Sequence, residues 1–126
     1  MPTNPPDAAL VAWKLTIRTG PRVEHARFDG LDDVLDAVEA RGRELAESAG
    51  REPVDVKLKR FEPIQQVVAR LEFSGPQRLI PSVTAGVDVR GDGSIEAYTG
   101  RVKRQVVDQR DGESAYGALR RELSAR

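Results

Sequence analysis

The chain of 126 residues contains no cysteine, so disulfide bonds, thiol chemistry and thiolate metal sites are excluded. Long apolar runs are also missing, because no stretch approaches the roughly 20 residues of a membrane-spanning helix. The opening Met1–Asp7 has neither the basic nor the apolar region of a signal peptide. We therefore expect a cytoplasmic protein that makes no contact with a membrane.

Catalytic motifs are equally scarce. His25 is the only histidine, and the chain has neither a Gly-x-Ser-x-Gly nucleophile motif nor a glycine-rich phosphate-binding motif. Residues 88–99 match part of a calcium-binding loop, but Arg90 and Thr99 stand where that loop needs acidic ligands. These absences predict a protein that is not an enzyme and has no metal site or cofactor. His25 itself is expected to be an exposed residue of the second strand.

Charge is abundant but balanced, with 20 basic and 20 acidic residues and a net charge of zero. Residues 1–50 carry six basic and nine acidic side chains, whereas residues 51–126 carry fourteen and eleven. Balanced charge does not predict wholesale binding of polyanions. The distribution predicts that any basic surface lies in residues 51–126.

The clearest periodic segment is Leu31–Ala49, where apolar residues recur at steps of three and four along one side of a helix. Asp29 can cap its start, and Gly50 can close its end. A helix that is apolar on one side must cover another layer. The segments around it supply that layer, because they alternate between apolar and polar residues as half-buried strands do.

Six segments show this alternation, and turn signals separate most of them. We expect strands at 10–18, 23–28, 53–59, 66–73, 83–90 and 95–107, with a bulge near Gly100 in the last and a hairpin tip at 91–93. Ser114 can cap a short final helix. Residues 1–9 are rich in proline and are expected to form a flexible arm before a single domain at 10–126.

The order ββ-α-ββββ-α predicts the α+β class. Every connection between successive strands is short enough for antiparallel pairing. We expect a curved antiparallel sheet of about six strands, with the long helix and the short C-terminal helix on its apolar face.

Basic side chains gather on the opposite, polar face of this predicted sheet. A single-stranded nucleic acid could lie there, with phosphates on lysine and arginine and a base stacked on a tyrosine. The residues predicted for such a site are Lys14, Lys57, Lys59, Arg70, Arg90, Tyr98 and Lys103. Charged residues are also ordinary on an uncovered sheet face, so this function is the second choice.

The first choice is a non-catalytic interaction or assembly module. An antiparallel sheet with a free edge can pair with another strand or pack against a second copy of itself. Leu79 and Ile80 form an apolar pair in the loop after the fourth predicted strand and are candidates for a protein interface. We expect self-association through the sheet edge or face, with the partner otherwise undetermined.

Overall fold

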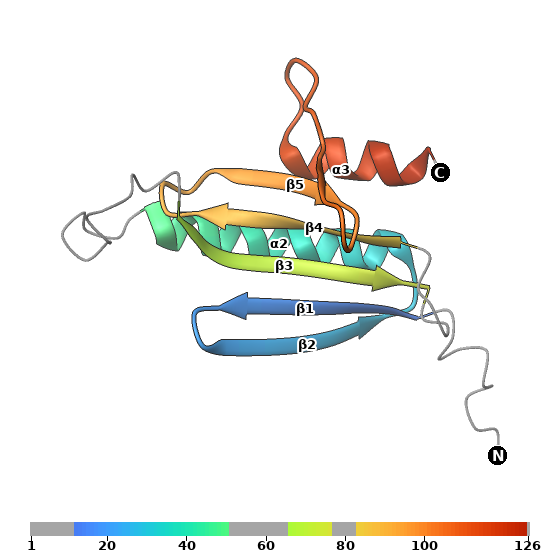
Figure 1. Cartoon of the computed structure of the whole chain (residues 1–126), viewed down its shortest axis with the longest axis horizontal. Coiled ribbons are helices and arrows are strands. Elements are labelled where there is room, and N and C mark those ends of the chain that lie inside the picture. Colours follow the sequence, from blue (N-terminus) through green and yellow to red (C-terminus); the bar gives the residue numbers. More distant parts are fainter. Residues whose placement is uncertain (1–11, 51–65, 77–82, 126) are drawn as a thin grey trace.

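The computed structural model describes residues 12–50, 66–76 and 83–125. Its strands are β1 (Trp13–Thr19), β2 (Arg22–Phe28), β3 (Val67–Gly75), β4 (Val83–Arg90), β5 (Ile95–Thr99) and β6 (Gln105–Val106), and its helices are α2 (Leu31–Gly50) and α3 (Ala115–Ser124). The strands form one antiparallel sheet in the order β2-β1-β3-β4-β5-β6 (Figure 1).

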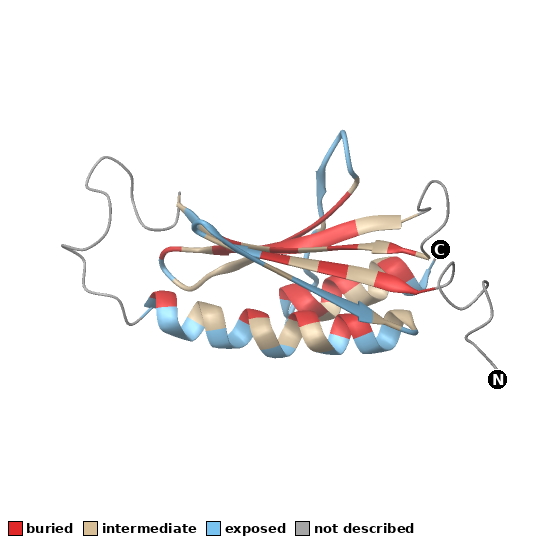
Figure 2. Ribbon diagram, turned by 90° about the horizontal axis from the view of Figure 1, so that it is seen from below, coloured by how far each residue is buried: buried red, intermediate tan, exposed pale blue. Residues whose placement is uncertain are grey.

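The sheet has two unlike faces. Both helices lie on the same side of it, and the segment between β5 and β6 projects from the other side (Figure 2). The predicted α+β class, with an open antiparallel sheet, one long helix and one short C-terminal helix, is confirmed. We call the side away from the helices the outward face.

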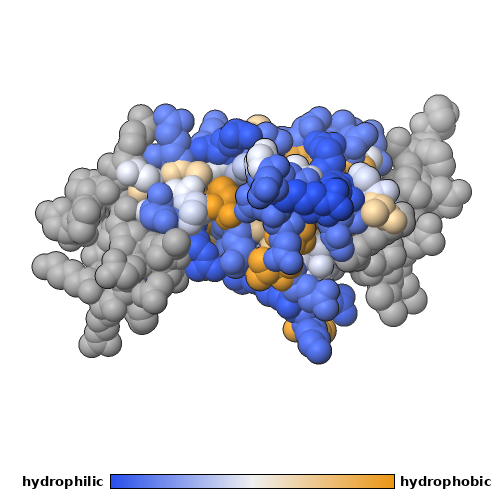
Figure 3. All heavy atoms as spheres, turned by 90° about the horizontal axis from the view of Figure 1, so that it is seen from above, coloured by the Kyte–Doolittle hydropathy of each residue, from blue (hydrophilic) through white to orange (hydrophobic). Residues whose placement is uncertain are grey.

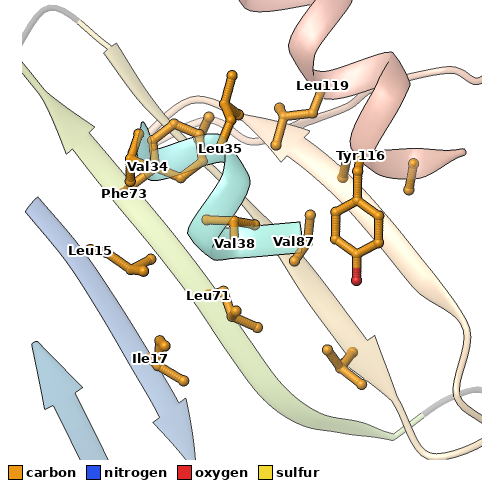
Figure 4. Close-up of a cluster of buried hydrophobic side chains, with 14 of the residues drawn as sticks. Leu15, Ile17, Val34, Leu35, Val38, Leu71, Phe73, Val87, Tyr116 and Leu119 are labelled. Atoms are coloured by element: carbon orange, nitrogen blue, oxygen red, sulfur yellow. The ribbon is translucent and has the colours of Figure 1, made fainter. Parts of the chain in front are cut away.

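The core lies between the sheet and α2. Alternate residues of the strands turn toward the helices, and the most buried of them include Leu15, Leu71, Phe73 and Val87 (Figure 4). Helix α2 meets them with Val34, Leu35 and Val38, and α3 adds Leu119. Burial of side chains of this size stabilises a fold by about 1.5–3 kcal/mol each, which explains how a chain with few aromatic residues closes a core.

Both helices follow the sequence pattern. The apolar stripe predicted for 31–49 faces the core, and Asp32 and Asp33 occupy the first turn of α2, where the helix dipole favours acidic residues. Ser114 caps α3 by accepting a hydrogen bond from the Gly117 N–H at 3.0 Å. Arg120 of α3 joins the helices, since its guanidinium contacts the carboxylate of Asp36 at 2.7 Å.

The prediction of a last strand running from Ile95 to Val107 with a bulge is wrong. Strand β5 ends at Thr99, and the chain then reverses so that β6 pairs antiparallel with β5. Gly100 makes this reversal possible, because its φ of +98° is a conformation that other residues rarely adopt. The register of β5 and β6 has two residue pairs, Tyr98–Val106 and Thr99–Gln105, and the Val107 N–H also donates a hydrogen bond to the Ala97 carbonyl oxygen at 2.9 Å.

Several predicted features lie outside the described residues: the arm at 1–9, the strand at 53–59 with Lys57 and Lys59, and the loop pair Leu79 and Ile80. They stay predictions, as does the division into an arm and one domain. In the part of the chain that is described, no helix is long and apolar enough to cross a membrane.

Candidate functional site on the outward face of the sheet

The outward face is divided into two regions of different chemistry. Over β3, β4 and β5 its charged side chains bond to one another, whereas over β1 and β2 they do not. We call the first region the Gly86 cluster; it consists of Arg70, Glu72, Gly86, Asp88, Tyr98 and Arg104. We call the second the hairpin face; it consists of the outward side chains Lys14, Thr16, Arg18, Val23, His25 and Arg27.

The strongest contact of the Gly86 cluster joins neighbouring strands. Arg70 of β3 and Asp88 of β4 are directly opposite each other in the ladder, and the guanidinium contacts both carboxylate oxygens at 2.7 and 3.2 Å. Asp88 is only 5% exposed. A bidentate pair of this kind fixes the direction of the arginine as well as its charge, so Arg70 is already occupied.

Tyr98 lies across the sheet instead of standing away from it. Its hydroxyl donates a hydrogen bond to Glu72 Oε1 at 2.6 Å, two strands away. The space beneath it exists because residue 86 is glycine: a Cβ there would lie 2.8 Å from the tyrosine hydroxyl oxygen and would also meet the Leu71 carbonyl oxygen. Tyr98 is therefore buried, with 3% of its surface exposed.

Arg104 covers the remaining side of Tyr98. Its guanidinium carbon lies 4.0 Å from the centre of the ring, within the range of a cation–π contact. The same group approaches Glu72 at 3.4 Å and Asp88 at 3.6 Å. The chain reversal at Gly100 brings Arg104 to this position. The continuous strand predicted for 95–107 did not predict this contact.

The two tyrosines of the chain are both protected from ionisation. Burial, helped by the hydrogen bond to Glu72, raises the pKa of the Tyr98 hydroxyl. Burial also raises the pKa of Tyr116 to about 12. An unfolded tyrosine ionises near pH 10, so above about pH 10 the unfolded chain releases protons that the folded chain keeps.

We therefore expect stability to be unaffected by these groups below about pH 10 and to fall between about pH 10 and 12, by about 1.4 kcal/mol per pH unit for each tyrosine. An alkaline titration should show tyrosinate absorbance appearing together with the loss of circular dichroism. A tyrosinate signal near the ordinary pKa of about 10 in a chain that is still folded would contradict this arrangement.

The hairpin face carries cations without anions. No ion pair or hydrogen bond to an acid is made by Lys14, Arg18 or Arg27 within the described residues. Lys14 and Arg27 are directly opposite each other on β1 and β2, and Arg18 is opposite Arg70 of the Gly86 cluster. Like charges in these positions destabilise a sheet. The fold therefore gains nothing from this arrangement.

Acidic residues lie on the other side of the molecule. The hairpin 13–28 carries four cationic side chains and one acid, Glu24, whereas α2 carries six acids and two arginines. Glu24 points to the helix side, where its carboxylate meets Arg41 of α2 at 3.0 Å. Among the described strands the unpaired cations belong to the first hairpin, whereas Arg101 and Lys103 are exposed on the loop after β5. Residues 51–65 lie outside the described residues, so a basic surface within 51–126 stays a prediction.

β2 is also an open edge. It pairs with β1 alone among the described strands, and its burial pattern shows five of seven residues exposed. In Figure 2 this strand faces the viewer, exposed over most of its length. His25 lies at its centre, with Nδ1 at 3.2 Å from Thr16 Oγ1. The prediction of an exposed strand histidine is confirmed.

The opposite edge offers a hollow of about 350 Å³ between β5, β6 and α3. Arg121 in its wall contacts the carboxylate of Glu113 at 2.9 Å, and this contact lowers the pKa of Glu113 to about 2. Hydrophilic side chains cover most of the described part of this side (Figure 3). The described residues contain no group of three histidine, aspartate or glutamate side chains placed to hold a metal ion.

The residues predicted for nucleic-acid binding thus have different surroundings. Lys14 lies on the hairpin face, and Lys103 is exposed on the loop before β6. Arg70 and Arg90 are paired with Asp88 and Glu96, and Tyr98 is covered by Arg104. The predicted site did not include Arg27. Its signal is the hairpin register, which places Arg27 directly opposite Lys14 and on the same face as Arg18.

Comparison of the chain with protein-family models, with curated proteins and with solved structures yields no match. Function therefore has to be inferred from the residues and their geometry.

Proposed function

We propose that this domain is a non-catalytic interaction module that binds an anionic partner through the hairpin face. The observation that carries the proposal is the contrast between the two regions of the outward face. Arg70, Arg90 and Arg104 are matched by acids, whereas Lys14, Arg18 and Arg27 have none among the described residues. Unmatched cations placed beside one another cost stability, and an anionic partner would remove that cost.

Self-association through β2 is supported less well. It would bring together two hairpins that each carry net charge +3 over residues 13–28. The exposed large apolar side chains of the described residues are four valines, at positions 23, 67, 102 and 106. Stable interfaces between copies are usually centred on larger apolar or aromatic side chains. An anionic partner therefore ranks first.

Single-stranded nucleic acid is one possible anionic partner. The hairpin face can contact phosphates, but Tyr98 is covered by Arg104 and offers no free ring for stacking. Stacking on aromatic rings contributes about 1–3 kcal/mol per base in proteins that bind single strands. Nucleic acid therefore serves here as one anionic probe, and the first test asks whether the hairpin face binds anions at all.

The test compares two variants with the same change of charge. Lys14→Glu with Arg27→Glu reverses the hairpin face, and Lys103→Glu with Arg101→Glu reverses two exposed cations on the loop after β5. Binding of labelled oligothymidylate and labelled polyglutamate is measured by fluorescence anisotropy over a salt series. We expect the hairpin variant to lose at least about tenfold in affinity, with the salt slope reduced by about 2 for the nucleic acid.

The loop variant should bind much as the parent protein does. Equal losses in both variants would show that net charge alone matters, and would overturn the assignment to the hairpin face. No binding of either probe at low salt would overturn the proposal as a whole.

A further inference from the structure

The open edge of β2 and the cations of the hairpin face belong to the same strand, and together they define the form of the partner. We propose that β2 accepts an extended acidic segment of another polypeptide as an added strand. This inference rests on the proposed function, because it names the partner class that the hairpin face would bind. Added strands combine backbone hydrogen bonds with contacts from alternate side chains, and β2 presents both.

The turn of the hairpin determines which backbone groups are open. Gly20, with φ of +58°, and Pro21 form a two-residue turn between Thr19 and Arg22, which are paired in the register. In such hairpins the pair that flanks the turn is hydrogen-bonded, the next pair is not, and the pairs continue to alternate in this way along the strands. Residues 23, 25 and 27 therefore direct their N–H and C=O groups away from β1, toward the open edge.

The devices that usually protect a sheet edge are missing from β2 in the described structure. The β1–β2 register runs from Trp13–Phe28 to Thr19–Arg22 without a bulge, and the strand contains no proline. Proline, bulges and covering segments are common ways to block edge pairing. The remaining protection is positive charge, which repels another basic strand and attracts an acidic one.

The outward face and the helix side of β2 would contact different side chains of an added strand. On the outward face an added strand would lie beside His25 and Arg27, with Lys14 one strand further in. On the helix side it would meet Ala26, which is exposed, and Glu24, which is paired with Arg41. Acidic residues fit the first side, and small apolar residues fit the second. Because side chains alternate along a strand, the matching segment alternates between acidic and apolar residues.

The experiment uses the full chain and two labelled peptides of the same composition. In one peptide glutamate and valine alternate, and in the other the glutamates and the valines form separate blocks. Their binding is measured with the parent protein, with His25→Ala and with His25→Pro. The alanine variant keeps the N–H at the edge, whereas proline removes it and tolerates an edge position of a strand.

We expect the alternating peptide to bind His25→Pro at least about tenfold more weakly than His25→Ala, because both variants lack the imidazole but only proline removes the edge N–H and the strand pairing around it. The block peptide should bind the parent at least about tenfold more weakly than the alternating peptide. Amide hydrogen exchange of the parent provides a readout that does not depend on whether His25→Pro folds. The peptide should slow exchange at residues 23, 25 and 27 and leave residues 24 and 26 unchanged.

The other outcomes separate this inference from the proposed function. If both peptides and oligothymidylate bind alike, and His25→Pro binds as His25→Ala does, the hairpin face binds anions but strand addition is overturned. If residues 23, 25 and 27 are protected in the free protein in a concentration-dependent way, the added strand is a second copy and the acidic segment is overturned. If no probe binds at low salt, both proposals fail.

Discussion

Replacing Gly86 with alanine should destabilise the fold by about 3 kcal/mol or more. The new Cβ would lie 2.8 Å from the Tyr98 hydroxyl oxygen and 2.9 Å from the Glu72 Cα, and it would also contact the Leu71 carbonyl oxygen. Two of these neighbours are backbone atoms of β3, so no side-chain rotation can relieve the contact. Strand β3 must shift, or Tyr98 must leave Glu72.

The effect that favours alanine at position 86 is smaller than the effects that disfavour it. Alanine loses less backbone freedom on folding than glycine, which favours the variant by up to about 1 kcal/mol. Overpacking in a close-packed region typically costs about 1–3 kcal/mol, and the hydrogen bond from Tyr98 to a carboxylate adds about 1.5–3 kcal/mol when it is lost. The unfavourable effects should therefore dominate, and chemical denaturation with circular dichroism would measure the difference.

Gly30 offers a matched control, because a Cβ at that position would meet nothing within 4 Å and its φ is not in the positive region. Gly30→Ala should change the free energy of unfolding by less than about 1 kcal/mol. A Gly86→Ala protein of unchanged stability would mean that Tyr98 does not lie over residue 86. That result would contradict the packing of Tyr98 against Gly86 described above.

The parts of the fold that followed from the sequence are those decided by local alternation. Trp13, Leu15 and Ile17 alternate with polar residues, and each faces the core because one side of β1 meets the helices. The stripe of α2 and the cap at Ser114 are local patterns of the same kind. A pattern repeated every two or four residues does not depend on distant parts of the chain.

The features that escaped prediction depend on contacts between distant residues. Nothing near Arg104 shows that it will lie on Tyr98, because that contact requires the reversal at Gly100. The isolated glycine at position 86 was the one local signal, since a glycine inside a strand often marks a close approach by another group. The unmatched state of Lys14 was equally hidden, because it depends on which acids other strands bring close.

Asp88→Ala should lower the free energy of unfolding by about 3 kcal/mol. The carboxylate is nearly inaccessible and bonds Arg70 at both oxygens, with Arg104 at 3.6 Å as a second cation. Removing one member of a buried ion pair costs about 3–5 kcal/mol. The lower end applies here, because roughly a third of each arginine side chain is exposed and can reach water.

The same substitution should change binding in the opposite direction. Without Asp88, the guanidiniums of Arg70 and Arg104 would share one acid, Glu72, and the outward face over β3 and β4 would become cationic. Where enough Asp88→Ala protein stays folded, we expect it to bind oligothymidylate several-fold more tightly than the parent at low salt, with a steeper salt dependence. Asp88→Asn keeps the shape of the side chain and serves as a control, because it removes the charge without leaving a cavity.

Tighter binding in both variants would mean that ion pairing over β3 and β4 is what confines anion binding to the hairpin face. Unchanged binding in both, with the fold intact, would contradict that explanation and would remove the contrast between paired and unpaired cations on which the proposed function depends.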